Sequence, residues 1–206
     1  MKKIKYSKKF IYLISPSKIK DLSFHEIERS FKTNKVSFFQ LRLKNTSKKK
    51  IFIVGKKIKK ICDKYKIKFI INDDPFLTKK LNADGCHLGQ KDMNVSKAKK
   101  IIKNKIIGLT CHNSKKLIQN AINYKVSYIA IGSFFSSKTK KIKYKAKIDL
   151  LNYAKNITKI PIVVIGGINS NNYKKLMLNK ANFLAISGYI WKNNKYKPHE
   201  AIKILK

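Results

Sequence analysis

The stretch VSFFQLRLKNTSKKKIFIVGKKIKKICDKYKIKFIIN, residues 36–72, carries the pattern that decides the fold. It opens with a mostly apolar run, Val36–Arg42, and closes with another, Lys68–Asn72. Such runs are typical of strands that are covered on both faces. Between them, Lys48–Tyr65 repeats apolar residues at three- and four-residue spacing, which predicts an amphipathic helix. Those residues are Ile51, Val54, Ile58 and Ile61.

The same alternation of short apolar runs and lysine-rich amphipathic stretches extends in both directions from this unit. We predict further helices at Ser114–Tyr124, which starts with a possible Ser cap, and at Asn171–Asn179. The full set of predicted strands is Phe10–Ile14, Val36–Arg42, Lys68–Asn72, Gly85–Leu88, Ile106–Thr110, Tyr128–Gly132, Ile162–Gly166 and Phe183–Ser187.

Eight strand-then-helix units in 206 residues leave about 25 residues for each unit, which is enough for a small (β/α)8 barrel. A doubly wound open sheet is the alternative α/β architecture. The chain has neither a GxGxxG nor a P-loop motif, which counts against the nucleotide-binding open sheets. Since no linker or change of composition divides the chain, we expect residues 1–206 to form a single barrel domain.

The apolar runs are too short for a membrane-spanning helix, which needs about 20 residues. The basic start of the chain lacks the apolar core of an export signal, so we expect a cytoplasmic protein. Cys62, Cys86 and Cys111 contain no CxxC pair, and we expect reduced, packed thiols without a zinc site or a disulfide.

The charge is extreme, because 49 basic residues face 10 acidic ones and give a net charge of +39. One interpretation is nucleic-acid binding. However, Arg29 and Arg42 are the only arginines, and the lysines are spread along the whole chain. Because arginine is the residue usually chosen for base edges, we favour a lysine bias of general composition. With either interpretation, the positive field attracts phosphorylated substrates.

Polar residues interrupt the pattern where the predicted strands end, which is where βα folds build their sites. Gln40, Arg42 and Lys44 would alternate onto one face and present an amide and two cations to an anionic ligand. Four of the ten acidic residues lie within one window of twenty. We expect Asp73 and Asp92 to be candidate Mg²⁺ ligands, whereas Asp84 precedes a strand and is expected at the opposite end. In the same window, Asp74 fits a turn or a helix cap.

The later strand ends carry groups that could hold phosphate. Ser133–Lys140 is rich in hydroxyls and lysine, and the loops at Gly166–Gly167 and Ser187–Gly188 offer backbone N–H groups. His87 lies within a strand and is more typical of a packed residue, and His112 follows a strand. His25 and His199 belong to no candidate group of site residues, and we expect them at the surface.

Seven segments, in this order along the chain, resemble the thiamine-phosphate synthases, a family of small (β/α)8 barrels. They are FQLRLK (39–44), INDDPFL (71–77), ADGCHLGQKDM (83–93), IIGLTCHN (106–113), GSFFSSKTK (132–140), PIVVIGGI (161–168) and FLAISG (183–188). The resemblance runs from Phe10 to about Ile190. It implies a transferase of thiamine biosynthesis that joins hydroxymethylpyrimidine diphosphate to hydroxyethylthiazole phosphate and releases pyrophosphate.

The resemblance also implies roles for individual residues. It assigns Asp73 and Asp92 to Mg²⁺, and it assigns Arg42, Lys44 and Lys140 to the leaving diphosphate. The residues implied to hold the pyrimidine diphosphate are Gln40, Arg42, Lys44, Asn72, Thr110 and Lys140. Those implied to hold the thiazole phosphate are Ser137, Thr139, Gly167, Ser187 and Gly188. Four positions depart from the usual family pattern: Thr110 replaces Ser, Ser136 replaces Pro, Ser137 replaces Thr and Gly188 replaces Ser.

Two alternatives remain at this point. A related branch of the family isomerises a thiazole carboxylate phosphate and would be expected to lack the metal carboxylates, which are present here. The other alternative is a basic module that binds RNA or DNA. As partners we expect small phosphorylated heterocycles, with no specific nucleic acid and no membrane, and the sequence does not specify an oligomeric state.

Overall fold

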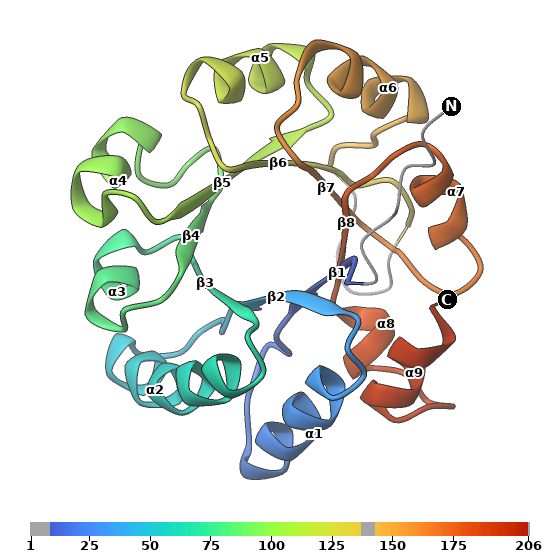
Figure 1. Ribbon diagram of the computed structural model, residues 1–206. Coiled ribbons are helices and arrows are strands. Elements are labelled where there is room, and N and C mark those ends of the chain that lie inside the picture. Colours follow the sequence, from blue (N-terminus) through green and yellow to red (C-terminus); the bar gives the residue numbers. More distant parts are fainter. Residues whose placement is uncertain (1–8, 137–142, 206) are drawn as a thin grey trace.

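Eight parallel strands follow one another in chain order around a closed barrel (Figure 1). The computed structural model describes residues 9–136 and 143–205 of the chain. The strands are β1 (Ile11–Ile14), β2 (Val36–Leu41), β3 (Lys68–Asn72), β4 (Gly85–Leu88), β5 (Ile106–His112), β6 (Tyr128–Gly132), β7 (Ile162–Ile165) and β8 (Phe183–Ile186). Since β1 pairs with both β2 and β8, the sheet has no open edge. The predicted (β/α)8 barrel is confirmed, and the open doubly wound sheet is excluded.

Every predicted strand is present, and the differences lie at the ends. β2 ends at Leu41, one residue before the predicted end, and β5 continues to His112, two residues beyond it. Strand ends are the least certain feature of an apolar run, because the side chains there face partly toward solvent and no longer need to be apolar.

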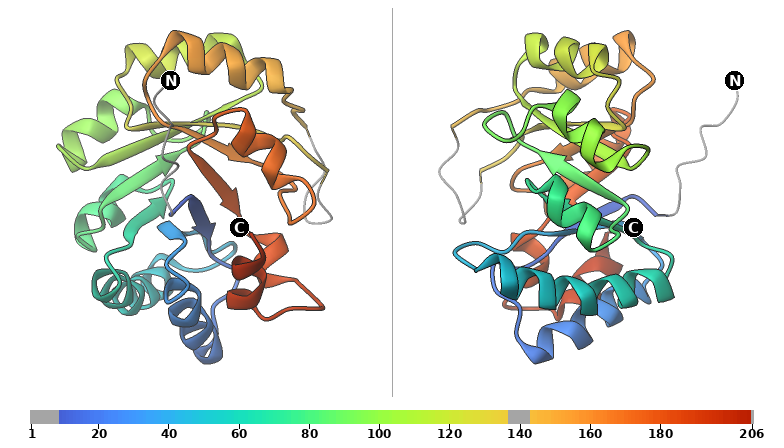
Figure 2. Two further views of the ribbon diagram at one scale, coloured as in Figure 1. Left: turned by 45° about the vertical axis from the view of Figure 1, so that its right-hand side comes forward. Right: turned by 90° about the vertical axis from the view of Figure 1, so that its left-hand side faces the viewer.

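Helices follow the strands and wrap around the outside of the barrel (Figure 2). Those in the described part of the chain are α1 (Asp21–Phe31), α2 (Lys48–Lys64), α3 (Pro75–Lys80), α4 (Val95–Ile102), α5 (Lys115–Asn123), α6 (Ile148–Ile157), α7 (Tyr173–Leu178), α8 (Gly188–Trp191) and α9 (Pro198–Ile204). The three predicted helices correspond to α2, α5 and α7. The Ser114 hydroxyl accepts a hydrogen bond from the Leu117 N–H and caps α5, as predicted.

Aromatic side chains fill the part of the barrel interior that lies near the amino ends of the strands. The Tyr12 ring stacks on Phe38 with centroids 5.3 Å apart, and Phe38 meets Phe183 edge to face at 5.0 Å. Tyr128 packs in the same cluster. The lumen is therefore a packed core and not a channel, so a ligand can enter only near an end of the barrel.

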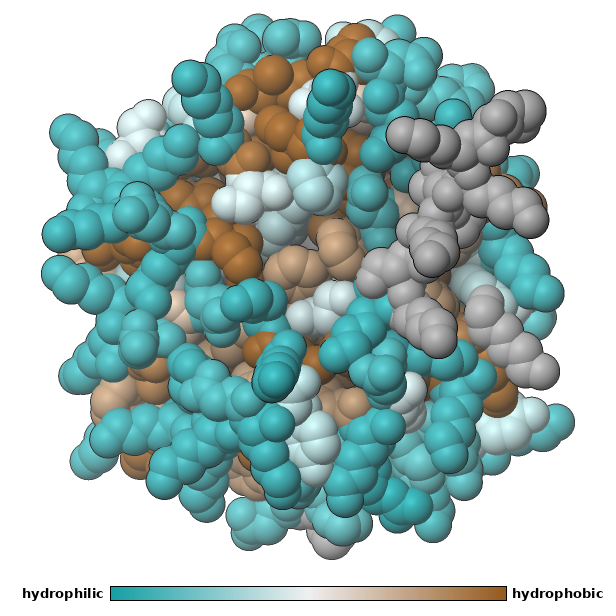
Figure 3. Space-filling model, in the orientation of Figure 1, coloured by the Kyte–Doolittle hydropathy of each residue, from teal (hydrophilic) through white to brown (hydrophobic). Residues whose placement is uncertain are grey.

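The outer surface is dominated by lysine. On α2, Val54, Ile58 and Cys62 are buried against the barrel, whereas Lys56 and Lys60 are exposed. Hydrophilic side chains cover most of the periphery of the face seen in Figure 3. Among the described residues, no helix combines the length and the apolar character needed to cross a membrane.

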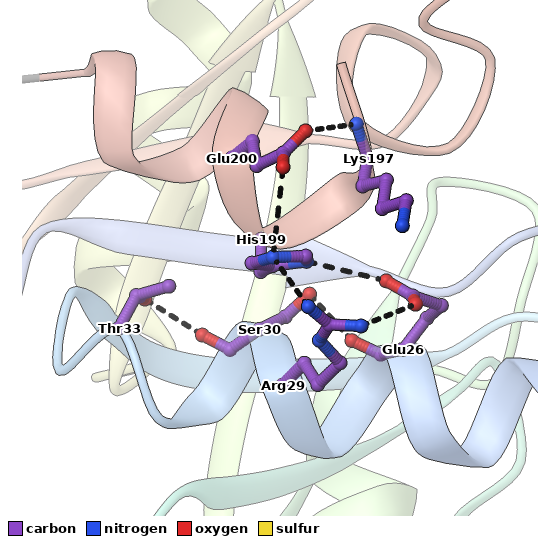
Figure 4. A network of polar contacts seen from close by, with 7 residues as sticks. All are labelled: Glu26, Arg29, Ser30, Thr33, Lys197, His199 and Glu200. Atoms are coloured by element: carbon purple, nitrogen blue, oxygen red, sulfur yellow. Dashed lines mark hydrogen bonds and ion pairs between the residues drawn. The ribbon is translucent and has the colours of Figure 1, made fainter.

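The last helix is fastened to the first through a polar network between α1 and α9 (Figure 4). Arg29 can only donate, so its Nη2 donates to His199 Nε2 at 3.0 Å. The other ring nitrogen, Nδ1, therefore carries the proton and donates to Glu26 Oε2 at 3.4 Å. Glu26 Oε1 also lies 3.7 Å from Arg29 Nη1. The expectation that His199 is a surface residue is wrong, because its partners lie on a helix about 170 residues away in sequence and it is buried between the two helices.

Candidate active site

Two amide side chains predicted to lie in one site meet at the carboxyl end of the barrel. Gln40, in β2, is almost fully buried at 3% exposure, and its Nε2 donates to Asn72 Oδ1 at 2.6 Å. Asn72 is the last residue of β3, and its Nδ2 donates to the carboxylate of Asp73. The neighbouring strands thus connect two amides and a carboxylate through successive hydrogen bonds, from the lumen to the rim.

Two carboxyl groups face each other at this rim. Asp73 follows β3 with a φ of +63°, and Asp92 lies in the loop after β4, where it accepts from the Gly89 N–H at 2.6 Å. Partial burial raises the pKa of Asp73 to about 7, together with the Asp92 carboxyl, which lies within hydrogen-bonding reach. Arg42 acts in the opposite direction through its charge. Two carboxylates this close need a shared proton or a cation between them.

The other acidic residues of the cluster have structural roles. Asp74 caps α3 by accepting from the Leu77 N–H at 2.9 Å, which is the cap expected from the sequence. Asp84 accepts from the Phe69 N–H at 3.0 Å and so joins the starts of β3 and β4, at the opposite end of the barrel. Of the four acidic residues that lie close together in the sequence, Asp73 and Asp92 therefore form a pair at the rim, and the other two have structural roles.

The predicted cations lie in loops beyond the strands. The Arg42 N–H donates to Ser15 Oγ at 2.9 Å, which ties the loop after β2 to the end of β1. Lys44 is exposed, and because β2 ends at Leu41, the strand alternation expected for it does not extend that far. Three residues of the predicted site lie outside the described part of the chain: Ser137, Thr139 and Lys140.

His87 joins a rim hydroxyl to the buried aromatic cluster. Its Nε2 lies 2.8 Å from Thr110 Oγ1, and its Nδ1 lies 2.8 Å from the Tyr128 hydroxyl. Burial lowers the pKa of His87 to about 4, so the ring is neutral at physiological pH. The Tyr128 hydroxyl in turn lies 2.8 Å from that of Tyr12. This series of hydrogen bonds was not predicted from the sequence. Two tyrosines at inward positions of otherwise apolar strands are a signal that could have indicated it.

His112 ends β5 with a φ of +50° and stacks on Tyr144 with ring centroids 4.3 Å apart. Tyr144 lies just after the undescribed residues 137–142. The contact therefore ties the end of β5 to the loop that carries the predicted thiazole-phosphate residues.

The glycines after β7 have a structural reason of their own. Gly166 and Gly167 have φ values of +109° and +60°, and a Cβ on Gly167 would lie 2.2 Å from the Ser136 carbonyl oxygen. They allow the loops after β6 and β7 to approach closely, at the place where sequence reasoning expected a ligand. Ser187 and Gly188 lie at the start of α8, and the Ser187 hydroxyl donates to the Ser15 carbonyl at 3.2 Å.

A family model described as thiamine monophosphate synthase matches residues 11–190. A protein called thiamine-phosphate synthase from Pelagibacter ubique is 61% identical over 207 aligned residues, which cover all of both chains. A protein of the same name from Erythrobacter litoralis is 35% identical and covers 88% of this chain and 87% of its own.

Among solved structures, a thiamine phosphate pyrophosphorylase from Pyrococcus furiosus superposes with a TM-score of 0.84 at 24% identity. The superposition covers 97% of this chain and 95% of the other. A tryptophan synthase α-subunit from the same organism superposes with a TM-score of 0.72 at 9% identity, so it shares the fold alone.

Proposed function

Because the chain belongs to the thiamine monophosphate synthase family, we propose that the carboxyl end of its barrel joins a pyrimidine diphosphate to a thiazole phosphate. The protein is a transferase of thiamine biosynthesis that acts as a thiamine-phosphate synthase. It links hydroxymethylpyrimidine diphosphate to hydroxyethylthiazole phosphate and releases pyrophosphate. The observation that carries this location is the facing pair Asp73 and Asp92, with Arg42 beside it.

The rim fits a magnesium ion that is shared with the substrate. Asp73 and Asp92 face each other at a separation that calls for a positive charge between them. Within the described ranges no cluster of three or more His, Cys, Asp or Glu residues could hold a metal by itself. Mg²⁺ typically takes one or two protein carboxylates and completes its shell with substrate phosphates and water. When bound here, the ion supplies counter-charge to the diphosphate oxygens.

The pyrimidine diphosphate lies across the first strand ends. Gln40 and Asn72 hold the aminopyrimidine side, and Thr110, Arg42 and Lys44 face the diphosphate with Lys140. As the bond between the methylene carbon and the diphosphate oxygen breaks, its electron pair leaves with pyrophosphate, where negative charge accumulates. Fixed cations near these oxygens stabilise the transition state more than the ground state.

The thiazole phosphate lies across the later strand ends, held by Ser137, Thr139, Gly167, Ser187 and Gly188. The lone pair of its ring nitrogen forms the new bond to the methylene carbon, whose positive charge the aminopyrimidine has delocalised. No protein nucleophile takes part. The chain's own residues therefore orient the two reactants and stabilise charge.

The test is an assay of thiamine phosphate formation from both phosphorylated heterocycles with Mg²⁺. Asp73→Asn and Asp92→Asn should each reduce the turnover number by at least about 100-fold, because the leaving group loses its counter-charge. Asp63→Asn is the matched control, since Asp63 is an exposed residue of α2 at the other end of the barrel. Near-normal turnover in both site variants, or full activity in excess chelator, would overturn the metal assignment.

A further inference from the structure

A chain of four hydrogen-bonded side chains runs from the sealed lumen to the rim. It joins Tyr12 of β1 to Tyr128 of β6, then to His87 of β4 and finally to Thr110 of β5, with 2.8 Å between the bonded atoms at each step. Tyr12 and Tyr128 are 1% and 2% exposed, so both side chains are shielded from bulk solvent. Thr110 is half-buried in β5, two residues before the strand ends at His112. This series of hydrogen bonds therefore has a buried end at Tyr12 and an end at Thr110 that faces the site.

The direction of donation along this chain follows from its closed end. A buried hydroxyl hydrogen needs an acceptor, and within the described residues the Tyr12 hydroxyl contacts one polar group, the Tyr128 hydroxyl. Tyr12 must therefore donate to Tyr128, and Tyr128 must donate to His87 Nδ1. The neutral His87 ring then carries its proton on Nε2 and donates to Thr110 Oγ1.

The opposite direction leaves a buried donor without an acceptor. If Thr110 donated to His87, then His87 Nδ1–H would donate to Tyr128, and Tyr128 would donate to Tyr12. The hydrogen of Tyr12 would then have no acceptor. A protonated His87 gives the same result, because it also donates to Tyr128.

We propose that Tyr12, Tyr128 and His87 are positioning residues that hold Thr110 as a hydrogen-bond donor to the diphosphate. This proposal rests on the proposed function, in which Thr110 faces the leaving group. Because Thr110 Oγ1 already accepts from His87, its own hydrogen is free to point toward a phosphate oxygen. Donation to that oxygen strengthens as negative charge develops there, so the arrangement acts on turnover.

The first test is the tautomer of His87 in the free wild-type protein, measured by ¹⁵N NMR of the histidine side chains. We expect a neutral ring with a protonated Nε2 and a bare Nδ1, and the His87→Gln variant identifies the signal by its loss. A protonated Nδ1, or a charged ring at neutral pH, would overturn the proposal. This measurement needs no substrate and no variant that must retain activity.

Two variants that each remove one buried tyrosine hydroxyl, Tyr12→Phe and Tyr128→Phe, give a matched comparison. In Tyr12→Phe, the hydrogen of Tyr128 still has His87 Nδ1 as its acceptor, so the Nε2–H tautomer should persist. In Tyr128→Phe, the His87 ring loses the hydroxyl that donates to its Nδ1. A mixture of the two neutral His87 tautomers should then appear. A pure Nε2–H signal in Tyr128→Phe would show that Tyr128 does not set the tautomer and would overturn the proposal.

Kinetics then link the tautomer to turnover. Tyr128→Phe and Thr110→Val should each lower the turnover number by about tenfold, the effect of about one hydrogen bond, and leave the KM for the thiazole phosphate unchanged. Thr110→Ser, which keeps the hydroxyl, should retain most of the turnover. Wild-type turnover in Tyr128→Phe or in Thr110→Val would overturn the proposal. If the wild-type protein formed no thiamine phosphate, the proposed function would fail and the tautomer would stand, whereas an Nδ1–H tautomer in an active enzyme would refute the positioning chain alone.

Discussion

At the scale of single residues, Gly167 combines a left-handed backbone with a close contact to the neighbouring loop. Its φ is +60°, and a Cβ at this position would lie only 2.2 Å from the Ser136 carbonyl oxygen. A side chain there is strained in backbone conformation and also collides with backbone that cannot rotate away. The paired glycines are visible in the sequence, but the contact that requires them lies in another loop.

Gly167→Ala should therefore lower the free energy of unfolding by about 1–3 kcal/mol. Urea denaturation measures the change. Ser96→Ala, an exposed position on α4, is the control and should change stability by less than about 0.5 kcal/mol. An unchanged midpoint for Gly167→Ala would show that the two loops separate easily.

The three thiols illustrate what composition alone can predict. Cys62, Cys86 and Cys111 are free and buried, as expected. Burial raises the pKa of Cys86 and of Cys111 to about 12, and it raises the pKa of Cys62 as well. Because the thiolate is the reactive form, iodoacetamide at pH 8 should label none of the three in the native protein and all three in urea. Rapid labelling of the native protein, followed by mass spectrometry, would contradict this expectation.

At the scale of elements, local sequence patterns predicted the bounds of strands and helix caps, but they did not predict contacts between residues far apart in the sequence. The strands β3, β4 and β6 match their predicted bounds because a strand covered on both faces must be apolar along its length. The cap of α3 at Asp74 is also a local signal. In contrast, the contact of His87 with Tyr128 and that of His199 with Arg29 join residues 41 and 170 positions apart. Such pairs exist only once the barrel has brought their elements together.

The α1–α9 network gives a prediction at this scale. Arg29→Lys should lower the free energy of unfolding by about 1–2 kcal/mol, because one ammonium cannot bond both Glu26 and His199 as the planar guanidinium does. Lys32→Gln, an exposed position just after α1, is the matched control and should have little effect. Equal urea midpoints for Arg29→Lys and the wild-type protein would show that the network does not fasten α9.

At the scale of the whole molecule, we expect the net charge of +39 to be carried mainly by an exterior that the reaction does not use. Most lysines of α2 are exposed, whereas Val54, Ile58 and Cys62 of the same helix pack on the barrel. Charges farther apart than a Debye length, about 8 Å at physiological salt, are largely screened. The field of this exterior therefore affects stability and encounter with anions more than the chemical step.

Moderate salt should accordingly raise the melting temperature, because it screens the repulsion among lysines, and it should leave most of the turnover intact. Reversal of Lys56 and Lys60 to Glu should change the salt dependence of melting more than it changes turnover. Thermal denaturation and the synthase assay at several salt concentrations measure both. Tight, sequence-selective binding of RNA or DNA at physiological salt, lost in these reversals, would instead support a nucleic-acid function.

Ring closure between β1 and β8 has a consequence for how the protein is made on the ribosome. Synthesis proceeds from the amino end, so β1 emerges first and its partner β8, at Phe183–Ile186, emerges near the end. Until then the growing sheet has two open edges, which are sites of unwanted pairing with other chains. The high sequence separation of this closing contact favours slow folding. Because like charges repel, we expect the lysine-rich exterior to keep nascent chains apart during that interval, when the open edges most need such protection.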